Sequence, residues 1–109
     1  MNRPDHEMPG DRIPVRIHAG MKEIVPEFLQ NALEDVDALR TALEHSDYQA
    51  IARLGHSMKG AGGFGFDYLN QMGLYLEEAA RIQALHRIGS LVSELEDYLH
   101  RVEPVYDPL

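Results

Sequence analysis

The chain has 109 residues, a formal net charge of −8 and no cysteine. A chain of this length folds as one domain and buries roughly two thirds of the surface that its unfolded form exposes, which is sufficient for one hydrophobic core. The lack of cysteine excludes disulfides, thiolate metal sites and thiol chemistry. The acidic charge argues against nucleic acid and anionic membranes as partners, because both attract clustered Lys and Arg. We expect proteins or small molecules as partners instead, and the charge favours a protein with a basic docking face.

The beginning of the chain predicts neither a signal peptide nor a folded element. Residues 1–16 contain three prolines and a glycine, so we expect a flexible leader, with a short helix beginning near Ile17. No apolar run has the length of a signal peptide, and no stretch approaches the ~20 apolar residues of a membrane span. We therefore expect a cytoplasmic protein.

Four amphipathic segments follow, at residues 23–45, 48–62, 67–81 and 84–102. In each of them apolar residues recur at steps of three and four, which is the period of a helix with one buried face. No segment shows the strict alternation of a half-buried strand. Short connections favour antiparallel neighbours, so the sequence predicts an all-α protein, an antiparallel up-down four-helix bundle.

Local signals divide these helices. Ser46 and Asp47 predict a break followed by a new N-cap, and Asp67 predicts the N-cap of the third helix. Pro104 ends the last helix. The bundle is therefore expected over residues 17–104, with a C-terminal tail at 105–109.

One stretch differs from ordinary amphipathic helix. Between His56 and Phe66 the chain carries Lys59 and four glycines. Glycine is about 1 kcal/mol worse than alanine inside a helix, so such a cluster needs a reason. The reason we infer is access, because small residues let another protein approach His56 closely.

A helical wheel places His56 on the solvent side. At ~100° per residue, His56 lies roughly 140° from the buried Ile51, while Lys59, Gly60 and Gly63 fall on the histidine's face within two turns. The pattern predicts an exposed imidazole beside a cation, with two side chains removed around it.

These residue types fit phosphoryl chemistry. An exposed histidine has a pKa of ~6.5, so a useful fraction is neutral and nucleophilic near pH 7. A lysine ammonium stabilises the charge that spreads over the phosphoryl oxygens during in-line transfer. The alternative is that His56 is a surface histidine without a function, next to a bend. The spacing that puts Lys59, Gly60 and Gly63 on the same face as His56 argues against this alternative.

At these residues the sequence resembles a histidine phosphotransfer (HPt) domain. His56-Ser57-Met58-Lys59-Gly60-Ala61-Gly62-Gly63 carries the likeness, which spans roughly residues 22–102 and includes Leu76-Glu77 in the third helix. The resemblance implies a four-helix bundle that relays phosphoryl groups in two-component signalling. It implies that His56 takes the phosphoryl group from a receiver-domain aspartate or a histidine kinase and passes it to a response-regulator receiver domain.

The same resemblance assigns the other roles. Lys59 would assist the phosphate charge, and Gly60 and Gly63 would keep the face open to the partner. No cofactor is expected, and Mg²⁺ would be bound by the receiver partner, since no carboxylate cluster is aimed at His56. The chain departs from the family at Gly65, which stands one place nearer to the histidine than is usual and indicates a shorter glycine bend.

There are three alternative functions. A metal site is disfavoured because no histidine pair stands at helical spacing, and Asp97-x-x-His100 is the nearest match to a di-iron motif. A phosphate-binding loop is disfavoured because the glycines follow a helix, so we expect no ATP-dependent kinase activity of the chain's own. An adaptor module, in which His56 is not phosphorylated, stays open as the alternative to a monomeric phosphotransfer protein.

Overall fold

The structure, a computed structural model, describes residues 11–108, so the leader expected at residues 1–10 and the last residue of the tail lie outside the described residues. In chain order, its elements are β1 (Ile13–Ile17), the 3-10 helix η2 (Ala19–Met21), α1 (Val25–Glu44), α2 (Tyr48–Met58), the 3-10 helix η3 (Lys59–Phe64), α3 (Asp67–Arg81), α4 (Leu85–Arg101) and β2 (Val102–Tyr106).

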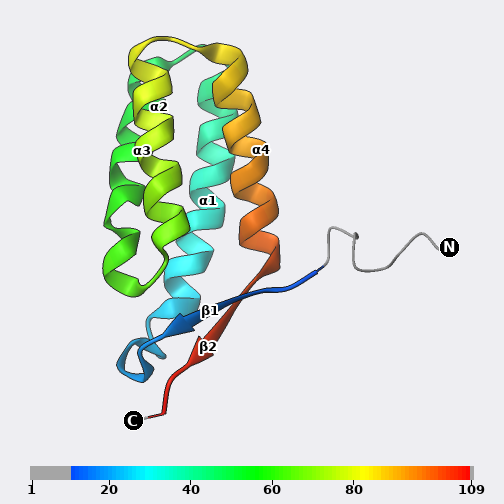
Figure 1. Cartoon of the computed structure of the whole chain (residues 1–109). Coiled ribbons are helices and arrows are strands. Elements are labelled where there is room, and N and C mark those ends of the chain that lie inside the picture. Colours follow the sequence, from blue (N-terminus) through cyan, green and yellow to red (C-terminus); the bar gives the residue numbers. More distant parts are fainter. Residues whose placement is uncertain (1–10, 109) are drawn as a thin grey trace, which may run out of the picture.

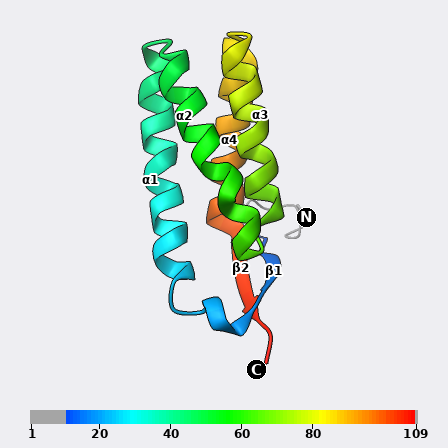
Figure 2. The ribbon, with the colours of Figure 1, turned by 90° about the vertical axis from the view of Figure 1, so that its left-hand side faces the viewer.

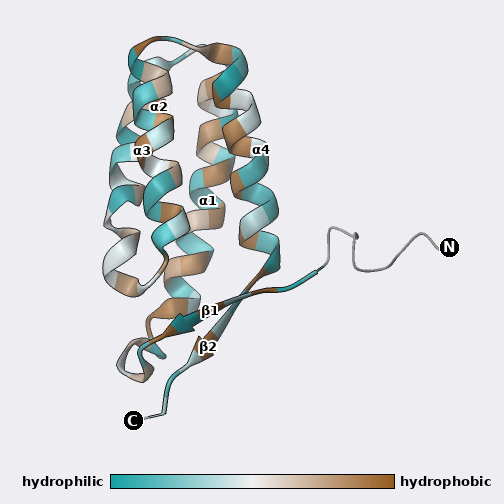
Figure 3. Cartoon of the chain, viewed as in Figure 1, coloured by the Kyte–Doolittle hydropathy of each residue, from teal (hydrophilic) through white to brown (hydrophobic). Residues whose placement is uncertain are grey.

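Helices α1 to α4 lie side by side, which confirms the expected helical bundle (Figures 1 and 2). The α1–α2 and α3–α4 turns lie at one end of the bundle, and the bend between α2 and α3 lies at the other end, near the strands. Each helix carries both hydrophobic and hydrophilic residues along its length (Figure 3), as an amphipathic helix requires.

The core is formed by the apolar stripes that the helical period predicts. Leu39, Ile51, Leu76 and Leu95 represent the four helices, and each of them is fully buried. No polar or charged residue of the described part of the chain is buried. An ion pair between Arg40 of α1 and Glu96 of α4 spans the outer surface.

The expectation of no strand was wrong. Strands β1 and β2 pair in parallel, from Ile13 opposite Val102 to Ile17 opposite Tyr106. They lie beyond the end of the bundle that carries the bend between α2 and α3 (Figure 1). Burial alternates along β1, but the strand has only five residues, and Pro14 within it argues locally against a strand. Proline is compatible with a two-stranded sheet, in which both strands are edges.

The strand β1 also changes the interpretation of residues 1–16. Ile13–Ile17 belongs to the folded sheet, and the last residue of β1 is fully buried where a helix was expected to begin. A salt bridge of 2.6 Å between the guanidinium of Arg16 and the carboxylate of Asp107 reinforces the pairing of β1 with β2. The boundaries proposed for leader, bundle and tail otherwise stay predictions.

The helix boundaries follow the local signals with two corrections. Asp47 caps α2 as expected, accepting a hydrogen bond from the amide of Ala50 at 3.1 Å. Helix α2 ends at Met58 rather than at residue 62, because the glycine-rich stretch tightens into η3. Asp67 is the first residue of α3, and Phe66 occupies the cap position.

Three stacked aromatic rings pack between α1 and the bend that joins α2 to α3. Phe28 of α1 stacks on Phe64 at 4.7 Å and on Phe66 at 5.4 Å between ring centroids. Phe66 is completely buried. These rings serve packing between α1 and the bend, which fixes the start of α3 relative to the end of α2.

Candidate functional site

His56 lies in the last turn of α2 with its side chain 69% exposed, as the helical wheel predicts. It borders a shallow hollow of about 360 Å³ that is also lined by Arg53, Ser57 and Glu77. An imidazole in this position is accessible to a reactant on another protein.

Glu77 of α3 joins the two residues that the motif singled out. Its Oε2 lies 3.2 Å from Nδ1 of His56, and its Oε1 lies 2.8 Å from Nζ of Lys59. The hydrogen bond from Lys59 is the main cause that lowers the pKa of the Glu77 carboxyl, with the His56 contact acting in the same direction. The result is a three-residue polar cluster of His56, Glu77 and Lys59 on the α2–α3 surface.

Sequence reasoning from the residues missed Glu77, although the signal for it was available. Gly55 and Gly73 face each other across α2 and α3: a Cβ on Gly55 would lie 2.7 Å from the Gly73 oxygen, and one on Gly73 would lie 2.5 Å from the Gly55 oxygen. Two such glycines let the helix backbones approach closely. Side chains next to the crossing then meet, so Glu77, one turn after Gly73, reaches His56 and Lys59.

Replacing Gly73 by alanine is expected to lower the free energy of unfolding by about 1–3 kcal/mol, the usual cost of overpacking. The added methyl group would also lie 2.8 Å from Cβ of Met58, so α2 and α3 must separate. Urea unfolding followed by circular dichroism measures the effect. The matched control is Gly63→Ala, where the new methyl group meets open space. An unchanged midpoint in Gly73→Ala would show that the close crossing is not needed.

The glycines of η3 divide into open and packed positions. Among the described residues, nothing lies within 4 Å of a Cβ placed on Gly60 or on Gly63. Residues three apart eclipse in a 3-10 helix, so these two positions lie in one row. Gly65 has φ +96° and ends η3 in the left-handed conformation, against Ile17 of β1. The bend is therefore closed by Gly65.

The Glu77 pairing predicts a pH dependence. A carboxyl with a lowered pKa in the folded state contributes stability above its usual pKa of 4.5, and this contribution is lost as the pH falls through the folded value. We expect Glu77→Gln to be less stable than the parent at pH 7, with the difference shrinking below about pH 4.5. Urea unfolding across pH tests this, with Glu78→Gln on the exposed face as the control. A difference that is constant with pH would contradict the pairing.

The other described histidines lie apart from this cluster. His45 and His100 each contact a backbone carbonyl four residues earlier, and His18 contacts the amide of Gly20, while His6 lies outside the described residues. Across residues 11–108 no group of three or more His, Cys, Asp or Glu residues is arranged to hold a metal ion. None of the helices in the same range is long and apolar enough to cross a membrane.

A helical bundle with an exposed histidine on one of its helices is the class of protein that this fold and site define. The chain belongs to the Hpt domain family, whose model matches residues 23–104. No curated protein and no solved structure gives a match. Membership of the family supports a phosphotransfer role in two-component signalling, with kinases and receiver domains as the general class of partner.

Proposed function

We propose that this protein is a phosphorelay intermediate in which His56 is the phosphorylated residue. The phosphoryl group comes from a receiver-domain aspartate or a histidine kinase and goes to the receiver domain of a response regulator. Family membership supports phosphotransfer in general. The observation that carries the assignment to His56 is its exposed imidazole, whose Nδ1 lies 3.2 Å from the Glu77 carboxylate.

The Glu77 contact selects the reactive nitrogen. A carboxylate only accepts hydrogen bonds, so the proton of the neutral imidazole lies on Nδ1, and Nε2 carries the free lone pair. That lone pair forms the N–P bond while the bond between phosphorus and the donor oxygen breaks. The donor aspartate leaves as a carboxylate. The phosphorylated ring keeps its Nδ1 proton and a positive charge, which the Glu77 carboxylate stabilises.

The return step uses the same contacts in reverse. An aspartate oxygen of the receiver bonds to phosphorus, the N–P bond breaks, and the imidazole regains its lone pair on Nε2. Lys59, held 2.8 Å from Glu77 and one turn beyond His56, supplies positive charge to the phosphoryl oxygens. Glu77 therefore acts as a positioning residue for the histidine and for the lysine.

Replacing Lys59 by alanine is expected to slow transfer by roughly five- to thirtyfold. This corresponds to about 1–2 kcal/mol for the loss of a charge-assisted hydrogen bond. Single-turnover transfer from a phosphorylated receiver measures the rate. Lys22→Ala, which removes the chain's other lysine, is the matched control. A Lys59→Ala rate equal to that of the parent would remove this lysine from the mechanism.

The same proposal includes a cytoplasmic monomer built as an antiparallel up-down bundle. Ser46 and Gln83, in the α1–α2 and α3–α4 turns, have positive φ angles of 52° and 57°. Such tight turns support helices that reverse direction at each connection. Sedimentation equilibrium of the purified protein tests the monomeric state.

The experiment that tests the function is a transfer assay with purified receiver domains carrying labelled phosphoaspartate. We expect the label to move to this protein, to survive base and to be lost in acid, as expected for a phosphorylated imidazole. No label from a broad receiver panel, with the protein folded, would favour an adaptor module with an unused histidine. Comparing donor receivers by rate then identifies the partner.

A further inference from the structure

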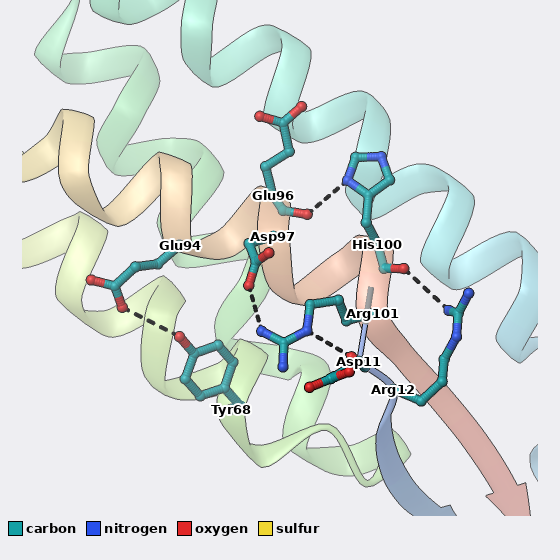
Figure 4. Close-up of polar contacts among 8 residues, drawn as sticks. All are labelled: Asp11, Arg12, Tyr68, Glu94, Glu96, Asp97, His100 and Arg101. Carbon is teal, nitrogen blue, oxygen red and sulfur yellow. Dashed lines mark hydrogen bonds and ion pairs between the residues drawn. The ribbon is translucent and has the colours of Figure 1, made fainter. Parts of the chain in front are cut away.

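A second hollow, of about 590 Å³, lies where β1 meets α3 and α4. It is lined by β1, by Gly65 of the bend and by side chains of α3 and α4, and it shares no lining residue with the hollow at His56. Its volume is in the range of sites that hold small organic molecules. Figure 4 shows polar contacts at its rim, where Tyr68 points toward Glu94 and Arg101 toward Asp97.

Two tyrosines line this hollow together with the apolar residues of β1. The rings of Tyr68 and Tyr98 lie 4.5 Å apart between centroids. Tyr68 is 40% exposed and donates its hydroxyl to Glu94 at 3.4 Å. Tyr98 is only 6% exposed, and no hydrogen bond of its hydroxyl to another group is found among residues 11–108. Tyr98 lines the hollow, so its hydroxyl is available to hydrogen-bond a ligand there.

The charge of the lining is negative. Three carboxylates, those of Asp67, Glu94 and Asp97, face one guanidinium, that of Arg101. The Arg101 guanidinium already has two partners: it donates hydrogen bonds to the carboxylate of Asp97 at 2.8 Å and to the backbone oxygen of Asp11 at 2.7 Å. The carboxylates of Asp67 and Glu94 thus remain without a cationic partner among the described residues.

The pKa values of both tyrosines are raised, mainly by burial. Burial, followed by the charge of Glu94, raises the pKa of Tyr68. Burial, with smaller contributions from Tyr68 and Asp67, raises the pKa of Tyr98 to about 12. Both hydroxyls are protonated at neutral pH. The ring faces and the carboxylates that line the hollow favour a positive charge between them.

We propose that this hollow binds a small organic cation, an ammonium group carried on an aromatic or alkyl body. The ammonium bonds to the carboxylates of Asp67 and Glu94, and the body packs on the rings of Tyr68 and Tyr98. The Tyr98 hydroxyl gains its missing partner. The site is separate from His56, so ligand binding and phosphotransfer are measured independently.

The test uses three probes of similar shape and different charge: phenethylamine, which is a cation at pH 7, 2-phenylethanol, which is neutral, and 3-phenylpropionate, which is an anion. Each is titrated into the full chain and followed by amide chemical shifts. We expect saturable shifts with the cation, centred on Tyr68, Glu94 and Tyr98, and affinity at least tenfold weaker for the other two probes, since a charged hydrogen bond is lost.

Variants then locate the site. Glu94→Gln keeps the shape of the side chain and is expected to weaken binding of phenethylamine about tenfold, whereas Glu44→Gln, an exposed change of the same charge on α1, leaves it unchanged. Tyr98→Phe keeps the ring and removes only the hydroxyl, and we expect weaker binding in a folded protein. Equal binding of the three probes, shifts located elsewhere, or equal affinity in Glu94→Gln and Glu44→Gln would overturn the proposal.

Discussion

Replacing His56 by glutamine is expected to abolish acid-labile labelling by phosphorylated receivers and to leave the fold intact. The imidazole side chain is 69% exposed, so its removal takes little apolar surface from the core. Glutamine keeps a polar side chain that can face Glu77, but its amide nitrogen has no lone pair available for attack on phosphorus. We expect the label to fall to background in a single-turnover assay, and the urea midpoint to stay close to that of the parent.

The matched control is His86→Gln. His86 is an exposed histidine in the first turn of α4, at the end of the bundle opposite the bend that follows α2, so its variant should be labelled like the parent. Labelling that persists in His56→Gln would place the phosphoryl group on another residue. Loss of labelling in both variants would point to a general effect of the substitutions rather than to one nucleophile.

Most of the bundle could be predicted from the sequence because it depends on local signals. Periodic apolar residues set the four helices, and the Asp47 cap set the start of α2. The end of α2 was placed too late, since helical period alone does not distinguish an α-helix from the 3-10 turns into which glycine-rich stretches tighten.

The strands could not be predicted in the same way. Pairing of β1 with β2 joins residues 13–17 to residues 102–106, so it depends on where the bundle places the two ends of the chain. Each strand alone is too short to carry a clear pattern, and a proline in each argues locally against a strand. The pairing is long-range: the fully buried Ile17 lies opposite Tyr106 of β2, which follows directly after the last helix.

The arrangement of the candidate site could be predicted only in part for the same reason. His56 and Lys59 share one helix, so their spacing is readable from the sequence. Glu77 belongs to another helix, and its place beside them depends on how closely α2 and α3 approach. Gly55 and Gly73, two glycines in helix interiors, were the clue to that approach, because each of them would cost stability without a packing reason.

Replacing Gly60 by leucine is expected to reduce transfer from a receiver roughly tenfold or more while the isolated protein keeps its stability. Nothing among the described residues lies within 4 Å of a Cβ at this position, and only Gly65 among the described glycines has a positive φ, so the chain accepts the side chain without strain. Leucine also has better helical propensity than glycine, which adds up to about 1 kcal/mol of stability. The substitution is expected to weaken binding of the receiver, because in-line transfer requires the receiver to reach the surface beside His56. The added side chain would hold the two surfaces apart and leave a gap in the interface.

A size series separates access from other effects of the same glycine. Transfer should fall in the order Gly60→Ala, Gly60→Leu, Gly60→Phe, with the urea midpoints unchanged or raised throughout. Ser90→Leu places the same side chain on the exposed face of α4 and should transfer normally. A small phosphodonor such as phosphoramidate needs no docking surface, so it should still label His56 in Gly60→Leu. If a receiver transferred normally to Gly60→Phe, the open row at residues 60 and 63 would have no part in access, and the glycines would serve only the turn into α3.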